Sequence, residues 1–99
     1  MILEVAEFQI RMGEQIPFEQ AMTGALQTIT AKVKGVVDYS FVRSVESPER
    51  YILKVTWERL EDHMQTYRQS AEREQWRALV SPFYAEPPKM EHFSIVTQS

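Results

Sequence analysis

Apolar and polar residues alternate along residues 2–11, which is the period of a strand that buries one face. Gly13 interrupts the alternation, and Pro17 suits the first turn of a helix, where its missing N–H costs nothing. Apolar residues then recur every three or four positions, which predicts an amphipathic helix that stops at Gly35. The residues of this apolar stripe are Phe18, Met22, Leu26, Ile29 and Val33.

The middle of the chain predicts a hairpin. Residues 36–46 and 50–57 both alternate, and Ser47-Pro48-Glu49 between them favours a turn. The inner faces of these two strands are expected to carry Val37, Tyr39, Phe41 and Val45, and then Tyr51, Leu53, Val55 and Trp57. Tyr39 and Tyr51 are candidates for a cross-strand aromatic pair.

A second helix is predicted over roughly residues 60–70, with an apolar stripe formed by Leu60, Met64, Tyr67 and Ala71. Ser70 can cap a further turn or two that holds Trp76. Prolines at positions 82, 87 and 88 end helical structure, and residues 89–97 form the last predicted strand.

The predicted order of elements is strand, helix, strand, strand, helix, strand. This order is the βαββαβ arrangement of the ferredoxin-like α+β fold, in which two helices cover one face of a four-stranded antiparallel sheet. The 99 residues contain no linker, so a single domain over residues 1–99 is predicted. Because Leu3, Val5 and Ile52 put apolar side chains on the other face as well, we expect two sheets to pack together in a homodimer.

Composition narrows the class of protein. The net charge of −3 argues against a nucleic-acid partner, because such proteins present a basic stripe. The chain has no cysteine, which removes disulfides and thiolate chemistry and fits a reducing compartment. The first fifteen residues lack both a basic segment and an apolar run, so neither a signal peptide nor a membrane span is predicted. A cytoplasmic protein with no membrane partner is the resulting expectation.

Residues 51–76 hold most of the candidate chemistry. A strand ends on Trp57, and a helix that carries His63 begins almost at once, so an indole and an imidazole lie near one strand-to-helix junction. His63 is a candidate general base for a phenolic substrate; the alternative is a half-buried histidine bonded to a backbone carbonyl or to Glu58. Trp57 would wall a pocket and orient a substrate oxygen with its N–H, although aromatic residues at such positions more often belong to the core.

Other candidates could likewise belong either to a binding site or to the core and surface of the fold. Tyr67 and Trp76 occur at helical spacing and are predicted to bind substrate as pocket walls or to belong to the core. His92 is expected on the surface of the last strand or inside a barrel formed by the packed sheets, since two histidines without a close ligand spacing make a weak case for a metal; neither a metal nor a cofactor is predicted. Arginines more often pair with glutamates or cover apolar surface, but three are candidates to hold an acidic substrate: Arg43, Arg68 and Arg77.

Several motifs together match a known family. They are Gly35 before an alternating strand, Ser44-x-Glu46 leading to Pro48-x-x-Tyr51, the run Trp57-Glu58-x-Leu60-Glu61-x-His63, then Tyr67-Arg68-x-Ser70, Trp76, Pro82-Phe83 and His92. Over nearly its whole length the chain resembles the antibiotic biosynthesis monooxygenase family of small dimeric α+β barrel proteins. The resemblance implies a dimer with a shared barrel and, in each subunit, a pocket between sheet and helices.

The resemblance also implies a range of activities. Characterised members of the family oxygenate polycyclic phenols or quinols without metal or flavin, while others degrade haem, isomerise small metabolites or have no known activity; membership therefore supports the fold better than any one reaction. The haem-degrading branch has a tryptophan three residues before the serine of the second helix and a histidine seven after it. Counted from Ser70, these positions hold Tyr67 and Arg77, so haem degradation is not expected.

Two functions stay open from the sequence. The first is a cofactor-independent monooxygenase that acts on a small aromatic phenol or quinol, with His63 favouring the substrate anion and Trp57, Tyr67 and Trp76 bounding the pocket. The second is a non-catalytic, dimeric accessory module that binds a small ligand. RNA binding on the sheet is disfavoured, because the basic-aromatic signature of such modules is absent.

Overall fold

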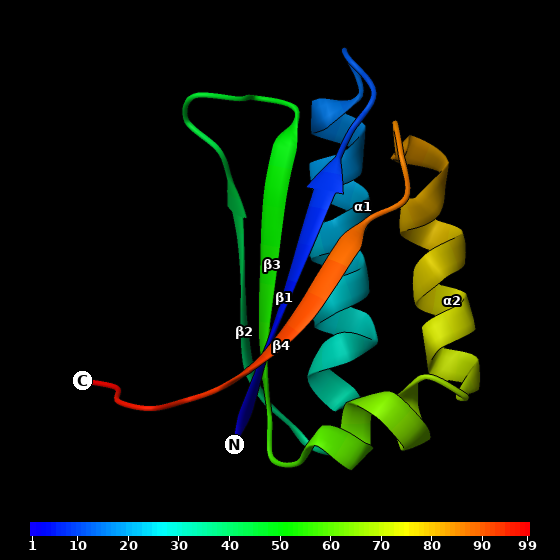
Figure 1. Cartoon of the computed structure of the whole chain (residues 1–99). Coiled ribbons are helices and arrows are strands. Elements are labelled where there is room, and N and C mark those ends of the chain that lie inside the picture. Colours follow the sequence, from blue (N-terminus) through cyan, green and yellow to red (C-terminus); the bar gives the residue numbers. More distant parts are fainter.

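Four strands form one antiparallel sheet in the order β2-β3-β1-β4, with two helices beside it (Figure 1). The computed structural model describes all residues, 1–99. The elements are β1 (Ile2–Gln9), α1 (Gln15–Thr28), the 3-10 turn η1 (Thr30–Lys32), β2 (Val36–Arg43), β3 (Arg50–Trp57), the π-helical segment η2 (Asp62–Tyr67), α2 (Ala71–Val80), the 3-10 turn η3 (Ser81–Phe83) and β4 (Lys89–Ser94). The ferredoxin-like fold predicted from the sequence is confirmed.

The central strand β1 pairs with β3 on one side and with β4 on the other. The register sets Ile2 opposite Trp57 on β3 and opposite Ser94 on β4. Alternate residues of β1 and β3 therefore point toward the helices, as predicted. The buried apolar core is formed by Ala6, Phe8, Ile10, Phe18, Met22, Ala25, Leu26, Tyr51, Leu53, Val55, Trp57, Tyr67 and Val80.

Strand β2 differs from the prediction because its register shifts between Val36 and Asp38. This irregularity lets Val36 pack against the core and turns Val37, which was predicted to face inward, toward the solvent. Val45 was placed on the same inner face, but it lies beyond the end of the strand and is 88% exposed. Both inward assignments are wrong, since an alternating pattern read from sequence assumes an unbroken register.

The predicted Tyr39–Tyr51 pair is also wrong. Tyr39 lies opposite Val55, and Tyr51 lies opposite Arg43. The ring of Tyr51 instead stacks on Phe41, with 5.3 Å between the ring centroids.

The predicted helix over residues 60–70 takes a different form. Residues Asp62–Tyr67 make a π-helical segment, in which the backbone N–H of Arg68 donates to the carbonyl of His63 at 3.1 Å. The wider turn changes which side chains face the sheet, because residues on it are no longer spaced as on an α-helix. His63 is buried, whereas Leu60, the first residue of the predicted stripe, is 40% exposed.

Helix α2 begins where the sequence placed a cap. The hydroxyl of Ser70 accepts the backbone N–H of Arg73 at 3.2 Å, which satisfies one of the free donors at the helix start. The last strand ends at Ser94, three residues before the predicted end at Thr97.

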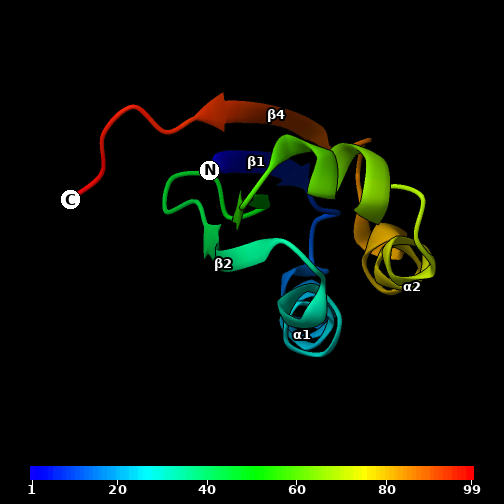
Figure 2. The ribbon, with the colours of Figure 1, turned by 90° about the horizontal axis from the view of Figure 1, so that it is seen from below.

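The two helices lie on the same side of the sheet, as Figure 2 shows. The other side of the sheet carries outward-facing apolar side chains; they are Leu3, Val5, Val42, Ile52 and Phe93. None of the helices combines the length and the apolar character needed to cross a membrane.

Gly35 fixes how the start of β2 meets η2. Its φ of +93° lies in the left-handed region that favours glycine, and a Cβ atom there would lie 2.5 Å from Cγ of Asp62. Asp62 is buried, with its carboxylate 3.3 Å from the guanidinium of Arg59. The backbone N–H of Glu58 donates to the carbonyl of Gly35 at 2.8 Å. These contacts hold η2, and with it His63, at the end of β3.

We predict that Gly35→Ala lowers the free energy of unfolding by about 2 kcal/mol or more, because it adds both backbone strain and a steric clash. Urea denaturation with a common slope measures the change. Gly13→Ala is the matched control: its φ is +85°, but its Cβ would meet no atom within 4 Å, so only the strain applies. Equal destabilisation by the two substitutions would contradict the role given to the contact with Asp62.

Candidate functional site

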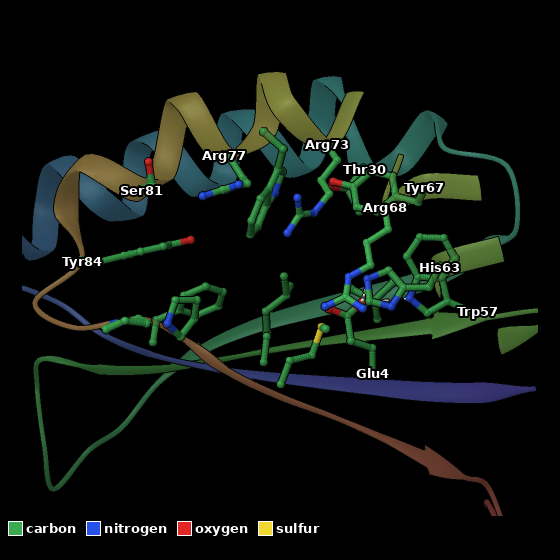
Figure 3. A pocket seen from close by; sticks show the side chains of 18 of the residues that line it. Glu4, Thr30, Trp57, His63, Tyr67, Arg68, Arg73, Arg77, Ser81 and Tyr84 are labelled. Carbon is green, nitrogen blue, oxygen red and sulfur yellow. Dashed lines mark hydrogen bonds and ion pairs between the residues drawn. The ribbon is translucent and has the colours of Figure 1, made fainter. Parts of the chain in front are cut away.

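A cavity of about 780 Å³ lies between the inner face of the sheet and α2 (Figure 3). Its volume falls within the roughly 300–1,000 Å³ range of small-molecule sites. The apolar floor comes from β1, β3 and β4 through Ala6, Phe8, Leu53, Val55 and Met90. The polar and aromatic residues that line it include Glu4, Trp57, His63, Tyr67, Arg68, Arg73, Trp76, Arg77, Tyr84 and Glu86.

Glu4 places a carboxylate on the inner face of the central strand. It is only 7% exposed, and this burial raises its pKa from 4.5 to about 7. The indole N–H of Trp57 donates to Glu4 Oε1 at 2.9 Å and opposes part of that rise. A carboxyl group whose pKa lies near neutrality can both accept and release a proton at pH 7.

His63 lies directly beside this carboxylate. Its ring stacks on Trp57 with 4.8 Å between centroids, and its Nε2 lies 3.5 Å from Glu4 Oε1. Its Nδ1 lies 2.7 Å from Nε2 of His92, which comes from β4. Burial, together with the positive potential of His92, Arg68 and Arg73, lowers the pKa of His63 to about 4, so the ring is neutral at pH 7.

One tautomer satisfies both contacts of His63. If Nε2 carries the proton and faces Glu4, then Nδ1 accepts a hydrogen bond from Nε2–H of His92. The three side chains thus form a continuous row from the buried carboxylate to the partly exposed imidazole of His92. Such a row can carry a proton between the cavity and the surface.

Aromatic side chains surround this row and the rest of the cavity. Tyr67 lies 5.6 Å from Trp57 between ring centroids, and burial raises the pKa of its phenol. Trp76 is partly buried, and its indole N–H is removed from solvent without a hydrogen-bond partner. Tyr84 packs against Phe8 at 5.5 Å between centroids, and its hydroxyl points into the cavity (Figure 3).

Three arginines form the charged wall. Arg73 and Arg77 extend into the cavity from α2, while Arg68 reaches the space beside Glu4 and His63 (Figure 3). Arg73 makes one long ion pair, 3.7 Å to Glu74, and neither Arg68 nor Arg77 has a carboxylate within ion-pair distance. The wall therefore presents positive charge that the protein itself leaves largely uncompensated.

All four site residues predicted from the sequence line this one cavity: His63, Trp57, Tyr67 and Trp76. Their chemical roles stay predictions. Of the three arginines considered, Arg68 and Arg77 line the cavity. Arg43 lies elsewhere and pairs with Glu19 at 2.9 Å. Glu58, considered as a partner of His63, makes no bond to it.

Sequence reasoning missed Glu4, Arg73 and Tyr84. A usable signal existed for Glu4, because it stands two residues before Ala6 on the apolar face of β1, where a carboxylate needs a reason to be buried. Arg73 precedes Arg77 by four residues, the spacing that puts two side chains on one helix face. Tyr84 follows the short turn at Pro82 and gave no periodic signal. The structure brings no group of three or more His, Cys, Asp or Glu side chains into an arrangement that could hold a metal ion.

Comparison with known proteins agrees with this architecture. The family model for antibiotic biosynthesis monooxygenases matches residues 1–79. The uncharacterized protein YczJ of Bacillus subtilis is 38% identical over 96 residues, which are 97% of this chain and all of that protein. A crystal structure of a candidate antibiotic biosynthesis monooxygenase from Bordetella bronchiseptica is 35% identical, with a TM-score of 0.90 over 97% of both chains.

A more distant structure has a described activity. SnoaB from Streptomyces nogalater, a cofactor-independent oxygenase solved as a mutant, is 15% identical with a TM-score of 0.80, over 98% of this chain and 94% of that one. At that identity the likeness concerns the fold alone. The match of the family model and the two relatives above 30% identity carry the assignment: the chain belongs to the antibiotic biosynthesis monooxygenase family.

Proposed function

We propose that this protein is a cofactor-independent oxygenase that acts on a small aromatic phenol or quinol. The proposal depends on one observation: the buried carboxylate of Glu4 lies 3.5 Å from the buried imidazole of His63 at one end of an aromatic-lined cavity. Family membership and the shared fold with SnoaB support the same reaction class. The cavity volume of about 780 Å³ suits a fused-ring substrate.

Glu4 is the proposed proton acceptor. Its Oε1 is held by the indole N–H of Trp57, which leaves Oε2 to take the proton from a substrate hydroxyl. To restore the carboxylate, His63 accepts the proton of Glu4 at Nε2 and releases the proton on Nδ1 to Nε2 of His92, across contacts of 3.5 Å and 2.7 Å. This step uses the tautomer opposite to the one that faces ionised Glu4. In this scheme His63 acts together with Glu4 instead of serving as a base by itself, because its lowered pKa makes it a weak one.

The substrate anion supplies the electrons for the reaction. It transfers one electron to O₂, and the resulting radical and superoxide combine to form a carbon–oxygen bond. For an anthrone-type substrate, the hydroperoxide then loses water, so that a CH₂ group and O₂ become a carbonyl group and H₂O. Arg68 lies beside Glu4 and His63, where its charge stabilises the anion that starts this sequence (Figure 3).

We predict that Glu4→Gln lowers the rate of oxygen uptake with an anthrone or menadiol substrate by about 100-fold or more, since general bases contribute about 10²–10⁴ in rate. His63→Ala should also lower the rate, by a smaller factor. Glu7→Gln is the matched control, because Glu7 lies on the same strand and pairs with Arg50 outside the cavity. An oxygen electrode measures each rate.

Two outcomes, one of this assay and one of this assay combined with thermal unfolding, would decide against the proposal. Unchanged uptake in Glu4→Gln and His63→Ala would remove both groups from the mechanism. Thermal stabilisation of the wild type by ligand, with no oxygen uptake for any phenol or quinol, would favour the non-catalytic binding module instead.

Glu4 and His63 also affect stability in opposite directions. The pKa of Glu4 rises from 4.5 to about 7 on folding, so its contribution to stability falls as the pH rises through this interval. The pKa of His63 falls from 6.5 to about 4, so its contribution grows as the pH rises from about 4 to 6.5. Where the two intervals overlap, the contributions largely cancel in the wild type.

We predict that Glu4→Gln removes the contribution of Glu4 to the pH dependence of stability and leaves that of His63. The free energy of unfolding of the variant, relative to wild type, should increase by about 2–3 kcal/mol between about pH 5 and about pH 8. Urea unfolding at both pH values measures this difference. Glu7→Gln should show no such gain, because Glu7 is partly exposed and its hydrogen bond to Arg50 lowers its pKa. A difference between Glu4→Gln and wild type that does not change with pH would contradict the raised pKa of Glu4.

We also propose that the protein is a homodimer through the uncovered face of the sheet. Val42 is exposed on this face, and Phe93 is 43% exposed, although both are apolar. Leu3, Val5 and Ile52 continue the same surface across the central strands. The register places Glu7, Lys54 and Glu91 on the same face, and apolar residues bordered by charged ones are typical of a face that another protein covers.

We predict a solution mass of twice the 11.6 kDa of one chain at micromolar concentration, measured by light scattering after size exclusion. Phe93→Lys should shift the protein toward the monomer, because pairing would bury an unpaired charge. Met12→Lys is the control, since Met12 is equally apolar but lies in the turn after β1. A monomeric wild type would contradict the dimer.

A further inference from the structure

We propose that the ligand of this cavity is an aromatic acid, whose carboxylate is bound by Arg73 and Arg77 at the end remote from the reacting hydroxyl. The inference rests on the proposed function for the direction in which the ligand lies, with its hydroxyl toward Glu4. The binding of the acid itself depends only on the charged wall of the cavity.

The two arginines are arranged as a pair. They are four residues apart on α2, so their side chains leave the same face of the helix about one turn apart. Both line the cavity, and Figure 3 shows both side chains entering it from the helix. Arg77 has no carboxylate partner, and the one partner of Arg73 is exposed Glu74 at 3.7 Å. Their planar donor groups suit a carboxylate, which can accept two parallel N–H bonds from one guanidinium.

The positions of the arginines separate two ends of the cavity. The charge of Arg68 acts on Glu4, His63 and His92, which places it at the reacting end. The charge of Arg77 acts on the phenol of Tyr84, whose hydroxyl points into the cavity from the opposite side (Figure 3). The charge of Arg73 acts on both Tyr84 and His63, which places Arg73 between the two ends. Arg68 therefore stabilises the anion formed by the reaction, and Arg77, with Arg73 one helical turn away, remains to bind a second acidic group.

The charge balance favours a single additional negative charge. Three arginines line the cavity, against the two glutamates Glu4 and Glu86. With Glu4 ionised, the lining keeps one excess positive charge, which matches a carboxylate monoanion. Trp76 lies between the two arginines in sequence, and its unpartnered indole N–H is a further donor in the cavity wall. An oxygen of the ligand would give this donor the partner it lacks.

A matched pair of ligands tests the inference without any variant. Rhein is an anthraquinone with a carboxylic acid, and aloe-emodin carries a hydroxymethyl group at the same position. The acid is ionised at pH 7. Isothermal titration calorimetry of the wild type at low salt should give a Kd for rhein roughly tenfold below that for aloe-emodin. Added sodium chloride should weaken the binding of rhein and leave that of aloe-emodin nearly unchanged.

Substitutions then test whether the two arginines bind the carboxylate of the ligand. Arg73→Gln and Arg77→Gln should each raise the Kd for rhein by about fivefold to tenfold and leave the Kd for aloe-emodin unchanged. Unchanged binding of aloe-emodin also shows that the variant is folded. Arg11→Gln is the control, since it removes an equal charge from an exposed residue outside the cavity. It should change neither affinity.

Several results would overturn the inference. Equal affinity of the wild type for both ligands, or no binding of rhein, excludes a site for the acid. Equal weakening of both ligands by the arginine variants shows that these side chains only shape the cavity. Because no turnover is measured, failure of the oxygenase proposal leaves a positive binding result intact. Conversely, oxygen uptake with a neutral anthrone and no preference for rhein would reject the acid site alone.

Discussion

The buried carboxylate of Glu4 is the constraint on which the whole site depends. A charged group under the helices of a small domain is tolerated only if it is neutralised or hydrogen-bonded. The β1–β3 register provides the bond, because Glu4 lies opposite Val55 and the next inward-facing residue of β3 is Trp57. The indole N–H therefore reaches the carboxylate at 2.9 Å. Burial of Glu4 and the position of Trp57 are thus one arrangement, and His63 completes it by stacking on the same indole.

The two helices pack against the sheet differently, and this difference creates the cavity. The inner side of α1 carries Phe18, Met22, Ala25 and Leu26, all fully buried against the sheet. On α2 only Val80 is fully buried, and Arg73 and Arg77 line the cavity, because their charges cannot be packed into an apolar core. One half of the sheet is therefore covered by a dry interface, and the other half by a hollow with a polar wall.

The sequence predicts the fold well because its strongest signals are local and periodic. The alternation in β3 and the stripe of α1 specify which faces are buried, and the turn at Ser47-Pro48-Glu49 specifies the hairpin. It predicts the site only in part. Trp57 and His63 are visible as a pair because they are close in sequence, whereas Glu4 and His92 join them through strand pairing. The π-helical form of η2 and the irregular register of β2 depend on tertiary contacts and leave no periodic trace.

The distance between Arg68 and Glu4 determines whether the carboxylate is basic enough to accept a proton. A guanidinium in contact would lower its pKa by about one to three units and leave a carboxylate too weakly basic to accept a phenolic proton. Arg68 lies outside ion-pair distance, so its effect is smaller than that of burial, and the pKa of Glu4 stays at about 7. Burial, the neighbouring His92 and this same charge together lower the pKa of His63 and keep it neutral, which lets the imidazole donate one proton while it accepts another. A cation that is near but not touching therefore permits a basic carboxylate, a neutral relay and a stabilised substrate anion in one site.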